Sequence, residues 1–398
     1  MRFTLVLPLV TFFLLGGCKT TEDSSRVNNS SASNSLRKAF QSHEQRMSSI
    51  RSNPVYKSEF GSEPYLKLHE EGTAVKGSVV VFHGFSAKPV QQNRFVDYLF
   101  NQGYHVYNAS VAGHYLKNLT TEAEVDVFQV TEQLQKAGVA LKQNQTVSWP
   151  YRAEGRDPVA AYKKEIDETW KVARFLPKPL YVAGLSVGAT QAIAMAAQYP
   201  EIRKIVAYAP LLKIEPKQRT RLKTANAGIK VARVAKANLK PIDGWFAWDP
   251  ANQFPVGAFW GAEDFGEDVV DNAPGAIVAN DQKVFLVTTH HEDAADTKVS
   301  ESFFGKVGGA GRKGNFHFHY DEAMRVPHPV NAVDQRSQAM VNHYYRTLFQ
   351  ETVRFLENGY IKARRLKLQD YNSNIPGYQE TIEVLNGPQL PPKIDLPQ

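Results

Sequence analysis

A serine between two glycines, in the segment Gly184-Leu185-Ser186-Val187-Gly188, constrains this chain more than any other. An apolar run over 180–183 precedes the segment, and an alanine-rich run over 189–198 follows it. This pattern predicts a strand, a sharp turn and a helix, with the serine in a strained backbone conformation that exposes its hydroxyl. The glycines leave room where the strand and the helix cross. Serine alone is a poor nucleophile, so the motif carries chemistry only if the chain also supplies a base and an acid.

Short apolar runs alternate with helical stretches along the chain. The predicted strands cover 79–82, 105–107, 180–182, 205–208 and 284–287, with a weaker one at 316–320. The predicted helices cover 93–102, 162–175, 189–198 and 335–357. Strands that are apolar on both sides are buried on both faces, so the sequence predicts an α/β fold with a mostly parallel central sheet flanked by helices.

The N-terminus has the pattern of an export signal, with Arg2 followed by an apolar stretch over 3–15. The segment Leu15-Gly16-Gly17-Cys18 resembles the lipobox of bacterial lipoproteins. That resemblance implies a signal peptide over 1–17, lipidation of Cys18, and a location in the bacterial cell envelope, at the outer membrane facing the periplasm. Cys18 is the only cysteine of the chain, so no internal disulfide is predicted.

Composition divides the remainder into segments. Residues 18–53 are rich in Ser and Asn, which predicts a flexible tether, and residues 54–372 are long enough for one large α/β domain. The proline-rich residues 373–398 are expected to be an extended tail. The net charge is +7, and its excess is concentrated between 213 and 240, inside an expected cap over 213–270. Aromatic stacking residues are absent from the basic run itself, so nucleic acid is not the expected partner.

Two further motifs surround the serine segment. Residues 79–89 read VVVFHGFSAKP, and Ala112-Gly113-His114 comes later. Together with the serine segment they resemble the α/β-hydrolase superfamily, in its carboxylesterase and monoacylglycerol-lipase-like branch. The resemblance implies an α/β-hydrolase fold, hydrolysis of a small-molecule ester or lipid substrate through an acyl-enzyme, and no cofactor. It places the oxyanion hole on the backbone N–H groups of Phe85 and Val187, with Ser186 as the nucleophile.

The base and the acid should follow the nucleophile in the order Ser, Asp or Glu, His. His328 lies in Val326-Pro327-His328-Pro329, between the last strand and the last helix, where the family keeps its base. His319 is the weaker alternative. His83 precedes the serine in the chain, so it is expected to have a structural role.

Three aspartates compete for the acid. Asp296 follows the strand at 284–287 and is followed by Val299 and a helical stretch, which is the family's pattern. Asp293, in the same loop, is the second candidate. Asp264, in Gly261-Ala262-Glu263-Asp264, resembles the family's Gly-x-x-Asp, but the apolar spacing around it is closer to that of a helix.

Two histidine groups could be interpreted as metal ligands. They are His290 and His291, and the pair His317 and His319. Adjacent histidines point in different directions and no third element has diagnostic spacing, so a polar loop is favoured and no metal is expected. Acyl transfer or amide hydrolysis would need the same catalytic residues, and a non-catalytic envelope binding protein is the alternative from another class.

Overall fold

The predicted apolar runs meet in one sheet. The structure, a computed structural model, describes residues 23–53, 56, 61–85, 87–115, 157–220, 256–331, 342 and 344–362. The seven-stranded sheet has the order β1-β3-β2-β4-β5-β6-β7, with β1 antiparallel to β3 and every other neighbouring pair parallel. The strands are β1 (Tyr65–Lys67), β2 (Gly77–Phe82), β3 (Tyr104–Ala109), β4 (Leu180–Leu185), β5 (Ile202–Tyr208), β6 (Lys283–Thr289) and β7 (Phe316–Tyr320). The predicted mostly parallel sheet is confirmed.

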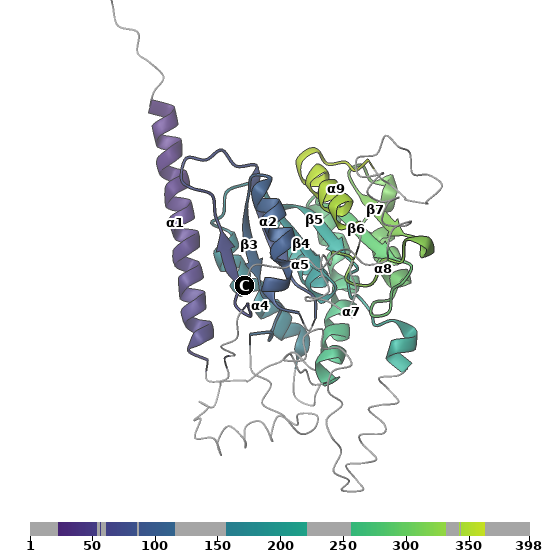
Figure 1. Cartoon of the computed structure of the whole chain (residues 1–398). Helices are drawn as coiled ribbons and strands as arrows, with labels where there is room; N and C mark the ends of the chain where they lie inside the picture. The colour runs from purple at the N-terminus through teal and green to yellow at the C-terminus, as the bar shows by residue number, and fades with distance from the viewer. Residues whose placement is uncertain are drawn as a thin grey trace, which may run out of the picture.

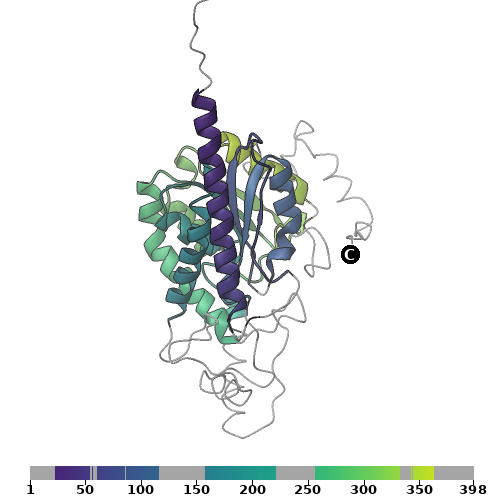
Figure 2. The same ribbon diagram turned by 90° about the vertical axis from the view of Figure 1, so that its left-hand side faces the viewer.

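Helices cover both faces of this sheet (Figure 1). One buried apolar cluster joins a face of the sheet to α1, α4, α5, α7 and α8, and a second cluster joins the other face to α2 and α9. Figure 2 shows this layering, with α2 and α9 on the right of the sheet and the teal and green helices on its left. The helices are α1 (Asp23–Arg51), α2 (Asn93–Asn101), α4 (Pro158–Ala173), α5 (Val187–Gln198), α7 (Val256–Ala279), α8 (Thr297–Lys306) and α9 (Tyr345–Asn358), with short 3-10 turns η1 (Pro89–Gln92), η2 (Gly309–Gly311) and η3 (Glu322–Met324).

The predicted helices at 93–102, 162–175 and 189–198 correspond to α2, α4 and α5. The predicted helix over 335–357 corresponds to α9, which begins at Tyr345; residues 332–341 lie outside the described part of the chain. Also outside it are the predicted signal peptide, Cys18, the tail over 373–398 and residues 221–255 of the expected cap. Among the described residues, no helix combines the length and the apolar character that crossing a bilayer requires.

The N-terminal segment differs from its prediction. Where composition predicts a flexible tether over 18–53, the structure has the 29-residue helix α1, which runs along one side of the body (Figures 1 and 2). Its inward side chains repeat at helical spacing: Ala39, His43, Arg46, Met47 and Ile50 are all buried. Only a few of the described α1 side chains face inward, so the overall composition, which is rich in Ser and Asn, does not indicate a buried helix face. This face becomes stabilising only because α4 covers it.

A buried ion pair fastens α1 to α4. The Arg46 guanidinium binds the Glu165 carboxylate, and the two side chains are only 6% and 4% exposed. Tyr115 donates its hydroxyl to the other Glu165 oxygen at 3.1 Å. Burial raises the pKa of Glu165, while the positive charge of Arg46 opposes that shift. Hydrogen bonds at the rim complete the contact: the Ser35 hydroxyl donates to the Phe175 carbonyl at 2.6 Å, and the Ser42 hydroxyl donates to the Lys171 carbonyl at 2.9 Å.

Removing one partner of this pair should weaken the fold. Arg46→Met leaves Glu165 buried without its cation, so we expect a loss of about 3–5 kcal/mol in the free energy of unfolding, measured by urea denaturation. The double variant Arg46→Met/Glu165→Leu should recover most of that loss, because no uncompensated charge remains. Arg51→Met is the matched control: its pair with Glu63 is exposed, and its removal should cost about 1 kcal/mol or less. Equal losses for Arg46→Met and Arg51→Met would contradict the role of the buried pair.

Candidate active site

Ser186 occupies the sharp turn between β4 and α5. Its backbone angles are φ 56° and ψ −123°, a conformation that side-chain-bearing residues rarely adopt. Two hydrogen bonds hold the turn against β5: the Ser186 N–H donates to the Tyr208 carbonyl at 2.8 Å, and the Leu211 N–H donates to the Ser186 carbonyl at 3.1 Å. Strain of this kind costs about 1–3 kcal/mol and persists only where the surroundings impose it. The predicted strand, strained turn and helix are therefore present at Ser186.

The flanking glycines permit the close crossing of strand and helix. A Cβ atom on Gly184 would lie 2.2 Å from the Gly188 carbonyl oxygen, and one on Gly188 would lie 2.0 Å from the His83 carbonyl oxygen. Both contacts are with backbone atoms, which cannot move aside as a flexible side chain can. Only glycine fits at either position, so the two glycines bring the α5 N-terminus against the loop after β2.

The loop after β2 lies beside the serine. Phe82 pairs with Gly184 in the sheet, and a Cβ atom on Gly84 would lie 3.5 Å from the Ser186 Cβ. Phe85 follows at once in this loop. Val187, the first residue of α5, carries one of the four N–H groups that helix geometry leaves without an intrahelical acceptor. Both predicted oxyanion donors thus belong to segments that border Ser186, and the positive end of the α5 dipole lies there as well.

His83 holds this loop in place. It is fully buried, its Nε2 accepts the Val111 N–H at 3.1 Å, and its Nδ1 lies 2.8 Å from the Gly84 carbonyl oxygen. Because Nε2 accepts, the proton is on Nδ1 and is donated to Gly84. Burial lowers the pKa of His83 to about 4, so the ring is neutral at physiological pH. These contacts agree with the structural role predicted for His83.

The segments that follow β6 and β7 lie at the same edge of the sheet as Ser186. The strands β4 to β7 are parallel, so the segments that follow them emerge at a common, carboxyl-terminal edge. An isolated parallel bridge joins His291, after β6, to Pro327, after β7. The next residue along each segment is Glu292 and His328, respectively. The bridge therefore brings these two side chains together.

His328 contacts the carboxylate of Glu292. The His328 Nδ1 lies 2.6 Å from the Glu292 Oε1, and the two side chains are 5% and 6% exposed. The same carboxylate oxygen accepts the N–H groups of Ala294 and Ala295 at 2.9 and 2.8 Å. These backbone donors fix the carboxylate in position. With Nδ1 facing a carboxylate, the other ring nitrogen, Nε2, is the one available to accept a proton.

The charge on this carboxylate decides the protonation of His328. Burial lowers the pKa of the imidazole, but the attraction of Glu292, with a smaller contribution from Asp293, outweighs it. The pKa of His328 is therefore raised above its ordinary value of 6.5. A raised imidazole pKa makes His328 a stronger proton acceptor, and Glu292 is its principal cause.

Asp296, which the sequence favoured as the partner of His328, has a different contact in the structure. It is the N-cap of α8, where its carboxylate accepts the N–H groups of Lys298 and Val299 at 3.0 and 3.4 Å. An aspartate followed by the first turn of a helix is also the sequence signature of an N-cap. The pattern of a strand followed by Asp296 and Val299 is therefore explained by the capping of α8. The carboxylate that contacts His328 belongs to Glu292, which the sequence analysis did not identify.

The two alternative aspartates are also placed. Asp293 is next to Glu292, and its pKa is raised, because its partial removal from water outweighs the attraction of the nearby His328. Asp264 lies inside α7, as the helical spacing around it indicates. Its neighbour Glu263 is fully buried, accepts the Ile214 N–H and binds Arg219 at 3.0 Å, so this segment anchors the start of the expected cap. His319 lies on β7 and contacts the Thr288 hydroxyl.

A signal for Glu292 does exist in the sequence. It is the first acidic residue after the strand that ends at Thr289, and a loop residue this near a strand end stays at the sheet edge. Choosing it over Asp293 and Asp296 requires knowing that His291 pairs with Pro327. That pairing links segments 36 residues apart, and neither segment shows it alone.

Comparisons with known proteins found similarity to a family model and to solved structures. A family model described as serine aminopeptidase, S33, matches residues 73–244, which is less than half of the chain. No curated protein sequence matches this chain. Solved structures that resemble the chain include a soluble variant of monoglyceride lipase from Saccharomyces cerevisiae in complex with a substrate analogue, which is 18% identical, with 78% of this chain and 98% of that chain covered and a TM-score of 0.45.

Two other solved structures have comparable identity and coverage to this chain. Monoacylglycerol lipase from Paleococcus ferrophilus is 15% identical over 75% of this chain and 99% of that chain, with a TM-score of 0.43. Est1E from Butyrivibrio proteoclasticus is 12% identical over 74% of this chain and 93% of that chain, with a TM-score of 0.41. The sheet order, the helices on both faces and the serine turn after β4 are those of an α/β hydrolase. The chain has the α/β-hydrolase fold.

The contact between Glu292 and His328 predicts how the imidazole titrates. In Glu292→Gln the negative charge is lost while burial remains, so the pKa of His328 should fall below its wild-type value. Asp296→Asn should leave that pKa unchanged, because asparagine still caps α8 and the charge removed is not the one that contacts His328. Two-dimensional NMR of histidine-labelled protein between pH 5 and 9 measures both. A fall in Asp296→Asn with none in Glu292→Gln would reverse the assignment.

Proposed function

We propose that this protein is a serine hydrolase that cleaves carboxylic esters through an acyl-enzyme. The observation that carries the proposal is the strained Ser186 at the N-terminus of α5, at the sheet edge where the loop with Phe85 and the pair of Glu292 and His328 also lie. The similarity to the serine aminopeptidase S33 model over 73–244 supports a hydrolase that uses a serine nucleophile, without choosing between ester and amide substrates.

Each residue then has one role. The hydroxyl of Ser186 attacks the ester carbonyl, and Nε2 of His328 takes its proton. The negative oxygen that forms is stabilised by the N–H groups of Phe85 and Val187, each worth about 2.7–4 kcal/mol of barrier. His328 gives its proton to the departing alcohol, and water then attacks the acyl-enzyme by the reverse sequence. Glu292 orients the imidazole and stabilises its charged form without taking the proton.

The nucleophile is tested by labelling. Wild-type protein should react with a fluorophosphonate probe, with the label on the peptide that contains Ser186, and should hydrolyse short p-nitrophenyl esters. Ser186→Ala should lose both, with residual hydrolysis below about a thousandth of wild type, while its thermal midpoint stays near the wild-type value. Hydrolysis above a tenth of wild type in Ser186→Ala would overturn the assignment. A folded wild-type protein that takes no label would favour the non-catalytic binding protein instead.

Matched variants identify the acid in the same assay. Glu292→Gln should lower kcat by about 100-fold or more, because the imidazole loses its orienting charge. Asp296→Asn keeps the cap of α8 and should retain most of the activity. Adding an alcohol acceptor separates hydrolysis from acyl transfer: a transferase would yield the new ester in preference to the acid, and an amidase would prefer the anilide over the ester.

We further propose that the protein is exported and anchored to the membrane by lipid on Cys18, on the pattern of residues 15–18 alone. In bacteria that lipidate exported proteins, the wild-type protein should be found in the membrane fraction and should incorporate labelled palmitate. Cys18→Ala should remove the label, since the acylated sulfur is gone. Incorporation that is equal in Cys18→Ala and wild type would contradict this proposal, and Ser186→Ala is the matched control that should label normally.

A further inference from the structure

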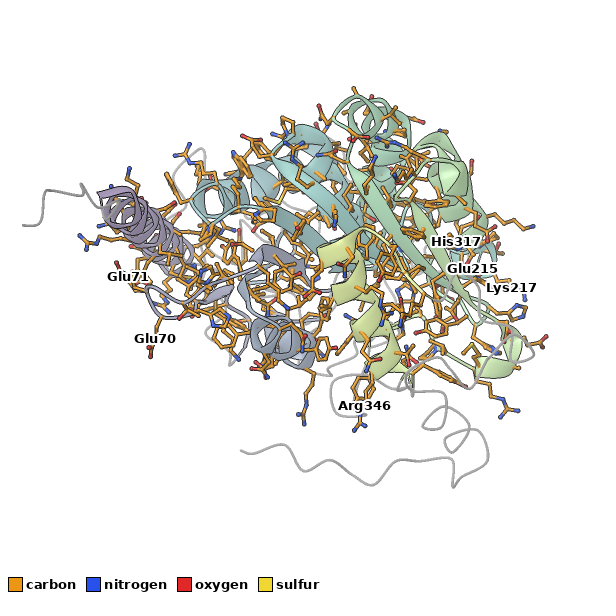
Figure 3. All side chains as sticks on the ribbon, turned by 90° about the horizontal axis from the view of Figure 1, so that it is seen from above. Glu70, Glu71, Glu215, Lys217, His317 and Arg346 are labelled. Atoms are coloured by element: carbon orange, nitrogen blue, oxygen red, sulfur yellow. The ribbon has the colours of Figure 1, made fainter. Side chains whose placement is uncertain are left out.

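The strand β7 presents two histidines on one face. Phe318 and Tyr320 point into the buried apolar cluster on the opposite face, while His317 and His319 are half-buried. The ring of His317 lies 5.6 Å from the ring of Phe304, a residue of α8. The histidine face of β7 is therefore the face that α8 covers. His317 lies at the far end of the molecule from α1 (Figure 3).

Thr288 of the neighbouring strand β6 holds both rings. Its hydroxyl oxygen lies 2.7 Å from Nε2 of His317 and 2.9 Å from Nδ1 of His319. A hydroxyl oxygen has two lone pairs, so it can accept an N–H from both rings, which leaves the second nitrogen of each ring able to bind an ion. Thr288 is itself 2% exposed, so the two imidazoles are oriented by a buried group. Such an oriented pair is typical of ligands positioned by their surroundings.

The third side chain comes from α8. Ligand atoms of Glu301, His317 and His319 all lie within 4.8 Å of one another. Zn²⁺ bonds of about 2.0–2.2 Å to nitrogen and oxygen place tetrahedral ligand atoms about 3.4 Å apart. The three ligand atoms therefore lie at most a little more than about 1 Å farther apart than the ligand atoms of an occupied Zn²⁺ site. Glu301 is exposed, so its flexible side chain can rotate and bring its carboxylate closer to the two histidines. Sequence spacing alone did not bring Glu301 together with the two histidines, because it belongs to another element.

We propose that Glu301, His317 and His319 bind one divalent transition-metal ion, Zn²⁺, at a site that shares no residue with the candidate active site. Two imidazoles and one carboxylate form a donor set that suits Zn²⁺, whereas Mg²⁺ and Ca²⁺ prefer oxygen ligands alone. The ion would join α8 to β7. The segment before α8 carries Glu292 and the segment after β7 carries His328, so the ion would tie together the two elements that hold this pair. This inference does not depend on the proposed function.

The test is metal binding by the full-length chain, purified in detergent without a polyhistidine tag and freed of metal with a chelator. Isothermal titration with ZnCl₂ should give one ion per chain, with micromolar or tighter affinity. Glu301→Gln and His319→Asn should each weaken binding by about tenfold or more. The matched controls Asp271→Asn and His290→Asn remove an exposed carboxylate and an exposed histidine outside the cluster, and they should bind as wild type does.

A thermal measurement accompanies the titration. Because Zn²⁺ binds only the folded site, it should raise the Tm of wild type, both controls and Ser186→Ala, and raise the Tm of Glu301→Gln much less. Without metal, Glu301→Gln should unfold at the wild-type Tm, since Glu301 is exposed. The proposal is overturned if wild type shows no saturable binding, or if Glu301→Gln binds as tightly as wild type. It is also overturned if His290→Asn loses as much affinity as His319→Asn.

Discussion

The close crossing of β4 and α5 is the constraint on which the rest of the site depends. With a side chain at Gly184 or Gly188, backbone atoms would lie within about 2 Å of a new carbon, so the helix could not approach the loop after β2. Because it does approach, the α5 N-terminus and the segment with Phe85 border the same serine. The strain at Ser186 follows from the same crossing. It is balanced by the hydrogen bonds of Ser186 to the segment that ends and follows β5.

The second determining contact is the single bridge between His291 and Pro327. It aligns two loops that leave neighbouring parallel strands, and the residues that follow, Glu292 and His328, come into contact as a consequence. The Glu292 carboxylate is oriented by two backbone N–H groups. The charge of Glu292 then outweighs the burial of His328, which by itself would have made the imidazole a weaker base.

The helix α1 shows how tertiary contact can reverse an expectation from composition. A stretch rich in Ser and Asn has little apolar surface to bury, and in isolation it is expected to be disordered. In the structure its few inward residues meet α4, and Arg46 finds the buried carboxylate of Glu165. Serine hydroxyls that lowered the apolar content donate to carbonyl groups of the body. Two of the serines whose abundance predicted a tether therefore help to attach α1 to the body.

The sequence by itself determined the parallel sheet, the serine turn with its glycines, the loop with His83 and Phe85, and the loop that carries His328. Each of these depends on local periodicity or on residues adjacent in the chain, so a short window contains all the information. Only the tertiary structure decided that Glu292 contacts His328 while Asp296 caps α8, and that Glu301 joins His317 and His319. These contacts join side chains from strands, loops and helices that are far apart in the sequence, so no local pattern indicates them. A local pattern such as Asp before a helix has the same form whether it caps the helix or orients a base.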